Sequence, residues 1–266
     1  MNYLVSFGTD RFLASQKWLT DSALRNGIDK VVAWDRVLLE QTSFYERNKS
    51  ILDQRRGAGF WLWKPFIIED ALTTLSPRDV LVYLDAGIEV IADLSPLLRL
   101  CTEKNGLLLF SGAGLCGEWT KRDCFVGMNC DDTNYRYGRM LSAAMIVVAK
   151  TERSCSFIHE WSLCCRQPRL LTDQANTCGL PNFSEFIDHR HDQSILSLIA
   201  IRDWIEVFRD PSQFGNHLKD ESYRVPGEWI VMPYGMRGIF RNSPYPTLLN
   251  HHRLQGAFAA DEPKPL

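Results

Sequence analysis

The chain has 266 residues, of which 45% are hydrophobic and 23% are charged, and this is the composition of an ordinary soluble globular protein. Thirty lysines and arginines stand against 32 aspartates and glutamates, which gives a formal net charge of −2. Affinity for nucleic acid depends on neutralising the phosphate backbone with an excess of basic residues, so this balance excludes nucleic acid as an expected partner.

The sequence shows no sign of a targeting or membrane-spanning segment. No apolar run approaches the roughly 18 residues that a spanning helix needs, and residues 1–7 lack the basic start and cleavage pattern of a signal peptide. Eight cysteines occur without a C-x-x-C pair, so we expect reduced, mostly buried thiols rather than disulfides or a zinc site. We therefore expect a cytoplasmic protein (in the host cytoplasm if the chain is viral) and leave peripheral association with a membrane open.

The first half of the chain alternates apolar runs typical of strands with helix-like segments. The Asn26-Gly27 turn, a cap at Thr42 or Ser43, and Pro65 in a first helical turn mark the boundaries. Strands are expected at residues 2–7, 30–34, 80–84 and 107–110, with helices at 9–25, 42–55, 64–75 and 95–105. This alternation predicts a mainly parallel sheet with helices on both faces.

The second half of the chain is less regular. We expect an irregular stretch at 111–138 with one short helix near 120–126, a polar loop at 169–186, and little periodicity after 210. Between these lie expected strands at 143–148 and 205–208 and helices at 152–165 and 192–202. We predict one α/β domain over residues 1–266, with a nucleotide-binding half at 1–110 and an acceptor-side half with a C-terminal tail at 111–266.

Asp85 directly follows the most apolar of these strands, and Gly87 comes two residues later. A buried strand that ends in an aspartate is how open α/β sheets place a charged group at a ligand crevice. A metal or ribose contact is one interpretation, and a carboxylate that caps the following turn is the other.

The segment GAGFWLWKP at 57–65 combines flexible backbone, two indoles and a cation. If the segment is extended, Trp61 and Trp63 lie on the same face and could stack on a base or a sugar, although either could simply pack against the sheet. Lys64 begins a helix, where the dipole slightly disfavours a cation. It is therefore either a surface lysine or a partner of Asp85 or of a phosphate.

Asp192 stands at the start of the helix expected at 192–202. It is either an N-cap carboxylate or a general base for an acceptor hydroxyl, which it must reach within hydrogen-bond distance. Arg190 and His191 could tune it or contact the acceptor. His189-x-His191 also has the look of a metal pair, but no further ligands stand at a recognisable spacing.

Three stretches occur together in order: GFWLWKP at 59–65, YLDAG at 83–87 and DHRHDQS at 188–194, with WTKRD at 119–123 and the 143–148 strand between them. This set resembles the GT-A-fold glycosyltransferases that use nucleotide-sugar donors, in particular the group found in bacterial and viral polysaccharide and capsule gene clusters. The resemblance extends over residues 2–208.

The resemblance implies a single GT-A (Rossmann-like) domain with a mixed twisted sheet and a donor cleft at the strand C-termini. It implies transfer of a sugar from a nucleotide-diphosphate donor to a hydroxyl of a glycan or glycoconjugate, with Asp192 as the catalytic residue. Inverting and retaining chemistry both stay open. The donor contacts that it implies, together with the readings above, are Asp10, Arg11, Trp61, Trp63, Lys64, Asp85, Ala86, Gly87, Lys121, Arg122, Arg190 and His191.

The resemblance also implies a divalent metal ion, Mn²⁺ or Mg²⁺, at the end of the Asp85 strand. Family members often carry Asp-x-Asp there, whereas this chain has Gly87 in place of the second carboxylate, which leaves Glu89 or water to substitute. A late histidine often completes the metal shell, so Asp85, His251 and His252 are the expected ligands.

Several of these residues could instead have purely structural roles, and the chain could have another function. Lys121 and Arg122 could belong to a solvated loop, Asp10 could cap a helix, and the late histidines could lie in a solvated tail. A nucleotidyltransferase or other nucleotide-sugar enzyme would need a Gly-rich basic loop after the first strand, and residues 6–11 match such a loop only weakly. A non-catalytic carbohydrate-binding or scaffold protein is favoured by the missing second carboxylate.

Overall fold

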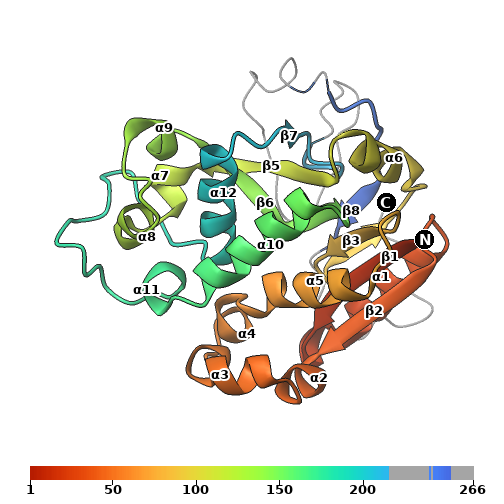
Figure 1. Ribbon diagram of the computed structural model, residues 1–266, viewed down its shortest axis with the longest axis horizontal. Helices are drawn as coiled ribbons and strands as arrows, with labels where there is room; N and C mark the ends of the chain where they lie inside the picture. The colour runs from red at the N-terminus through yellow and green to blue at the C-terminus, as the bar shows by residue number, and fades with distance from the viewer. Residues whose placement is uncertain (216–239, 241, 253–266) are drawn as a thin grey trace.

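The computed structural model describes residues 1–215, 240 and 242–252 (Figure 1). Its main feature is a six-stranded sheet in which β6 runs antiparallel to both neighbours while the other pairings are parallel. The prediction of an α/β fold with a mixed sheet is therefore confirmed. The strand order is β2 (Lys30–Asp35), β1 (Asn2–Gly8), β3 (Val80–Leu84), β6 (Arg139–Ala149), β5 (Leu107–Leu115) and β7 (Val207–Phe208).

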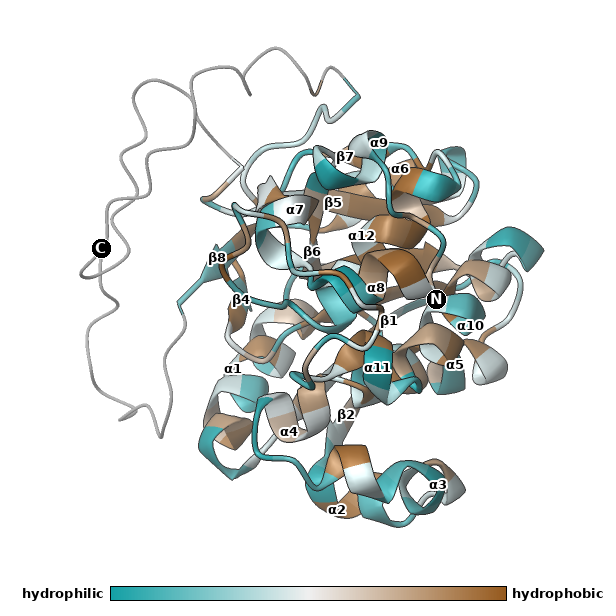
Figure 2. Cartoon of the chain, turned by 90° about the vertical axis from the view of Figure 1, so that its left-hand side faces the viewer, coloured by the Kyte–Doolittle hydropathy of each residue, from teal (hydrophilic) through white to brown (hydrophobic). Residues whose placement is uncertain are grey.

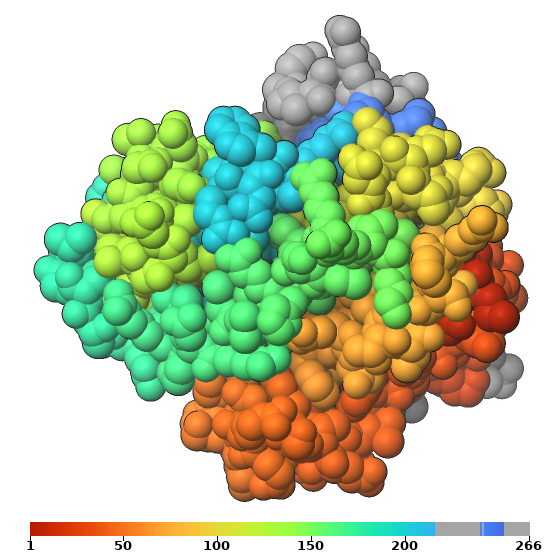
Figure 3. All heavy atoms as spheres, in the orientation of Figure 1, coloured from red at the N-terminus to blue at the C-terminus, as the bar shows by residue number. Residues whose placement is uncertain are grey.

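Helices cover both faces of the sheet because side chains alternate along each strand. In β3, Leu81 and Tyr83 join one apolar cluster, and Val80, Val82 and Leu84 join the other. The first cluster is covered by α5 (Trp63–Thr74), α10 (Glu152–Cys165) and α12 (Asp192–Arg202), and the second by α1 (Leu13–Leu24) and α6 (Ser95–Glu103). In the space-filling view, α10 lies across the middle of one face (Figure 3).

Burial on both faces explains why the central strands read as unbroken apolar runs. All five residues of β3 are buried, and Figure 2 shows apolar residues concentrated on β5 and β6. Each fully buried Val, Leu or Phe stabilises the fold by about 1.5–3 kcal/mol. All eight cysteines lie within the described residues as free thiols, and five of them are buried, as expected.

Local helix signals behave as predicted. Thr42 is the N-cap of α3 (Ser43–Leu52), and its hydroxyl accepts a hydrogen bond from the amide of Tyr45 at 3.1 Å. Proline stands in the first turn of α6. One short helix was missed, α2 (Arg36–Glu40), because it is little more than one turn that depends on the Asp35 cap.

The irregular regions are more ordered than predicted. The stretch at 111–138 was expected to hold one helix, but β5 extends to Leu115 and three short helices follow, since single turns leave no periodicity to read. They are α7 (Cys116–Trp119), α8 (Arg122–Gly127) and α9 (Thr133–Arg136), and further single turns are η1 (Asp10–Phe12), α4 (Gly57–Phe60) and α11 (Pro168–Leu171).

A small antiparallel pair was also missed. It joins β4 (Ile88–Val90) to β8 (Leu249–His251), which lie far apart in the sequence, so no local pattern predicts the pairing. The rest of the predicted C-terminal tail lies outside the described residues. Within the described part of the chain, no helix has the length and apolar character that a membrane crossing requires.

A bulge interrupts β6 beside the end of β3. Leu109 of β5 pairs with Ile146, but the next residue, Phe110, pairs with Ser142, so residues 143–145 have no partner on β5. Bulges of this kind bend a strand and redirect its polar groups. Here the carbonyl of Ala144 accepts the amide of Asp85 at 2.9 Å, and the carbonyl of Ala143 is available to a side chain.

The segment before α5 is a left-handed turn rather than an extended stretch. Five consecutive residues, at 57–61, have φ between 51° and 99°. Left-handed backbone costs about 1–2 kcal/mol for each residue other than glycine, so it persists only where packing imposes it. Glycine is required at Gly59, because a Cβ there would lie 2.5 Å from the Cα of Leu52.

Candidate functional site

Three charged side chains form a row at the edge of the sheet: Asp85, Lys64 and Asp192. The Lys64 ammonium lies 3.3 Å from Oδ1 of Asp85 and 3.2 Å from Oδ2 of Asp192. The side chains of Lys64 and Asp192 are 3% and 4% exposed, whereas that of Asp85 is 37% exposed. Asp85 is therefore the carboxylate of the row that faces solvent.

Each member of the row comes from a different element. Asp85 follows β3, Lys64 lies in the first turn of α5, and Asp192 is the first residue of α12. The bulge in β6 completes the site, because the Ala143 carbonyl accepts a hydrogen bond from Lys64 at 3.0 Å. The Tyr83 hydroxyl, on the same side of β3 as Asp85, donates to Oδ1 of Asp85 at 2.5 Å.

Burial and mutual charge set the protonation of the row. Burial raises the pKa of Asp192 to about 6, against the opposing effect of Lys64. Burial acts to lower the pKa of Lys64, but the charges of Asp192 and Asp85 outweigh it and the pKa is raised. Burial also raises the pKa of Tyr83 well above 10, so this phenol stays a neutral donor.

Asp192 is the first residue of α12 rather than its N-cap, which is His191, so the alternative of an N-cap carboxylate does not hold. It also does not reach out toward solvent as a base for an acceptor would, because it lies on the buried side of Lys64. The geometry makes it the inner partner of the ammonium.

The two indoles of the 57–65 segment do not form a stacking pair. Trp63 is 5% exposed, stacks on Phe7 with ring centroids 4.1 Å apart, and donates to the Gly57 carbonyl at 3.0 Å. Trp61, half-buried, lies against His191 at 5.5 Å. A shared face would require an extended segment, and the backbone is left-handed there instead.

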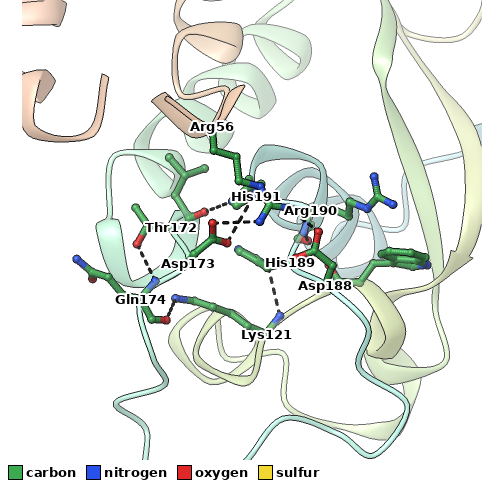
Figure 4. A network of polar contacts seen from close by, with 12 residues as sticks. Arg56, Lys121, Thr172, Asp173, Gln174, Asp188, His189, Arg190 and His191 are labelled. Carbon is green, nitrogen blue, oxygen red and sulfur yellow. Dashed lines mark hydrogen bonds and ion pairs between the residues drawn. The ribbon is translucent and has the colours of Figure 1, made fainter. Parts of the chain in front are cut away.

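His189 and His191 are structural partners of neighbouring segments rather than a metal pair (Figure 4). His189 contacts the Leu170 carbonyl at 2.8 Å through Nε2 and accepts the Lys121 amide through Nδ1 at 3.3 Å. His191 contacts the Leu171 carbonyl through Nδ1 at 2.7 Å. Burial lowers the pKa of both imidazoles, so both are neutral at pH 7.

The backbone of His191 is strained, with φ 51° and ψ −116°. Such conformations cost of order 1–3 kcal/mol and gather at functional sites. Arg56 was not among the predicted site residues, yet it stabilises this region: it pairs with Asp173 at 3.1 Å and with Asp188 at 2.5 Å (Figure 4). The guanidinium of Arg190 lies over the ring of Trp119, 4.2 Å from its centroid.

The expected charged cluster at 121–123 is not a solvated loop. Lys121 is 3% exposed and donates to the Gln174 carbonyl at 3.0 Å, and burial lowers its pKa. Arg122 pairs with Asp131 at 2.8 Å. These residues hold the segment that leads to α12, and these contacts join them to Gln174 and Asp131 rather than to the Asp85 row.

Asp10 and Arg11 lie directly after β1, and both are exposed. Asp10 makes no helix cap, since it is the first residue of η1 and Thr9 is its N-cap. Val5 pairs with Tyr83 in the parallel register, so the end of β1 lies beside the end of β3. The predicted donor residues of the first turn are thus at the same edge of the sheet as Asp85.

The late histidines are brought to the Asp85 segment. His251 pairs with Ile88 across β4 and β8, and the His252 amide donates to the Gly87 carbonyl at 3.1 Å. The His252 ring stacks on Trp18 at 5.2 Å, and burial lowers its pKa to about 4. The alternative of a solvated tail is wrong for these two residues.

The residues present do not fit the metal site that the resemblance implies. Oδ1 of Asp85 already receives a hydroxyl and an ammonium. Glu89, the expected substitute for a second carboxylate, accepts from the Trp18 indole at 3.1 Å. Over residues 1–215, 240 and 242–252, no three His, Cys, Asp or Glu side chains are grouped as a metal would need.

Comparison with known proteins gives similarity in fold only. No protein-family model matches the sequence, and no curated protein does. The apo structure of the bifunctional glycosyltransferase WbbM is 14% identical with a TM-score of 0.43, and the match covers 74% of this chain and 36% of that one. This chain therefore spans about a third of WbbM.

Two further structures cover more of their own length. Mouse xyloside xylosyltransferase 1, in its apo form, is 10% identical with a TM-score of 0.48, over 100% of both chains. The galactosyltransferase LgtC in complex with donor and acceptor sugar analogs is 13% identical with a TM-score of 0.44, over 95% of this chain and 87% of that one. At these identities and scores, no activity is carried over from them.

Proposed function

We propose that the protein is a glycosyltransferase of the GT-A type, which moves a sugar from a nucleotide-diphosphate donor to a hydroxyl of a glycan or glycoconjugate. The observation that supports it most is the row of Asp85, Lys64 and Asp192. These residues come from the three stretches that carry the family resemblance, far apart in the sequence. An ordered row at the carboxyl end of a sheet strand is where open α/β folds bind ligands.

In this proposal Asp85 contacts the donor, because it is the exposed carboxylate of the row. Lys64 and Tyr83 fix its orientation. The leaving diphosphate gains negative charge as the glycosidic bond breaks, and a preorganised cation stabilises that charge. Arg11, exposed and directly after β1, is our candidate for this contact.

Asp192 acts on the reaction through Lys64 rather than on the acceptor. Its carboxylate is 4% exposed and paired, so a hydroxyl cannot reach it without displacing the ammonium. We therefore assign Asp192 as a positioning residue. In this proposal, groups other than this carboxylate orient the acceptor.

The test is donor turnover. Purified protein is incubated with a panel of UDP-, GDP-, ADP- and dTDP-sugars, and free nucleotide is measured with and without glycan acceptors. We expect one donor to be consumed, and Asp85→Asn to lower its turnover by about 100-fold, a typical loss for a preorganised polar contact. Asp21→Asn, an exposed carboxylate on α1, is the matched control and should keep full turnover.

Two outcomes count against this proposal. Full turnover in Asp85→Asn would remove Asp85 from the site. Nucleotide-sugar binding without turnover, seen by calorimetry across the whole panel, would favour the non-catalytic carbohydrate-binding protein that Gly87 in place of a carboxylate suggests.

A further inference from the structure

We infer that Lys64 is the resident cation of this site, and that Asp85 binds a hydroxyl of the donor rather than a divalent metal ion, so that turnover needs no added metal. This inference rests on the proposed function and narrows it. It concerns the chemistry of the group that Asp85 recognises.

The first step is the occupancy of Asp85. Its Oδ1 already receives the Tyr83 hydroxyl at 2.5 Å and lies 3.3 Å from the Lys64 ammonium. A divalent ion binds carboxylate oxygen at about 2 Å, so on either oxygen it would lie within a few ångströms of that ammonium. Two cations so close repel each other, and the burial of Lys64 weakens the screening of that repulsion by water.

The second step is that Lys64 cannot move away. Its side chain is 3% exposed, and it is held by the Ala143 carbonyl as well as by the two carboxylates. Withdrawal would leave Asp192 buried without a counter-charge, which is costly. The ammonium is therefore a fixed part of the site.

The third step is that the neighbouring groups are committed to other contacts. Glu89 accepts from Trp18, whose ring stacks on His252. Gly87 offers a carbonyl, and this accepts the His252 amide. Among the residues that the structure describes, no three His, Cys, Asp or Glu side chains gather as a metal site would require.

The remaining chemistry of Asp85 is that of a hydrogen-bond acceptor. The side chain is 37% exposed, so a ligand can reach it. A carboxylate that lies 3.3 Å from a buried ammonium suits a neutral hydrogen-bond donor, and sugar or ribose hydroxyls are such groups. Lys64 thus performs the charge neutralisation that a metal would otherwise supply to Asp85.

The first experiment does not depend on activity. Mn²⁺ is titrated into the intact protein by calorimetry, with Lys64→Met as the variant that removes the ammonium and leaves two carboxylates facing one space. We expect no Mn²⁺ binding by the unaltered protein below about 1 mM, and at least about tenfold tighter binding by Lys64→Met. Lys17→Met, an exposed lysine on α1, is the control and should behave as the unaltered protein.

Binding of Mn²⁺ by the unaltered protein below about 100 µM would overturn the inference. Thermal melts establish whether Lys64→Met is folded. If it is not, the titration of the unaltered protein still decides the matter, because it uses no variant.

The second experiment separates this inference from the proposed function. The donor consumed in the panel is assayed in EDTA and in Mn²⁺, and we expect the two rates to agree within about twofold. A loss of tenfold or more in EDTA that Mn²⁺ restores would refute the inference while the transferase stands. If no donor is consumed at all, the transferase proposal fails, and the Mn²⁺ titration alone judges Asp85 and Lys64.

Discussion

Lys64 and Lys121 are equally buried and have opposite environments. Each is 3% exposed. Lys64 lies within 3.3 Å of two carboxylates, and its pKa is raised, whereas Lys121 donates to the Gln174 carbonyl, and burial lowers its pKa. Burial alone disfavours an ammonium, and only close anions reverse that effect. The opposite pKa shifts thus distinguish a lysine that belongs to a charged site from one that holds a loop through a hydrogen bond.

The largest effect on stability is expected from removing the Lys64 ammonium. Lys64→Met leaves Asp85 and Asp192 without their shared cation, and we expect a loss of about 3–5 kcal/mol in the free energy of unfolding. Urea denaturation measures it. A loss below about 1 kcal/mol would mean that the row contributes little to the fold.

The pH dependence of stability comes second. The pKa of Asp192 in the folded protein is about 6, above its ordinary value of 3.8. The folded state therefore holds an extra proton between these values, and the stabilising contribution is fully present below pH 4 and is lost as the pH rises through 6. Its size is about 2–3 kcal/mol.

Asp192→Asn provides the comparison for this prediction. We compare the free energies of unfolding of the unaltered protein and of Asp192→Asn from pH 4 to 7. As the pH rises, the unaltered protein should lose stability relative to the variant. A difference that stays flat over this range would contradict a raised pKa for Asp192.

The smallest effect is expected at Lys121. Lys121→Met loses one hydrogen bond to a carbonyl, worth about 1 kcal/mol, but it also relieves the cost of burying a charge. We expect the free energy of unfolding to stay within about 1 kcal/mol of the unaltered protein in the same urea assay. A loss as large as that of Lys64→Met would erase the distinction between the two lysines.

Several parts of the fold and the site could be read from the sequence because they depend on local patterns. The buried strands appear as apolar runs, α12 begins at Asp192 as predicted, and Thr42 caps α3. The pairing of Lys64 with Asp85 was expected as one of two alternatives, since a cation in a first helical turn is mildly unfavourable. The structure contains that pair.

Other parts depend on contacts that no local pattern announces. The bulge in β6 arises from a register shift against β5, and the left-handed turn at 57–61 is imposed by packing against Leu52 and His191. Tyr83 could have been found, because a residue two positions before Asp85 on a strand shares its side. The burial of Asp192 beside Lys64 is a tertiary property that no local pattern shows.

The left-handed turn also bears on the order in which the molecule assembles. Its three residues other than glycine, Ala58, Phe60 and Trp61, would relax to right-handed backbone in an isolated segment. We expect the turn to form only after α3 and the start of α12 are in place, so its contacts are absent from the folding transition state. Contacts of that kind leave the folding rate unchanged and slow unfolding, which makes this corner of the protein a determinant of kinetic lifetime.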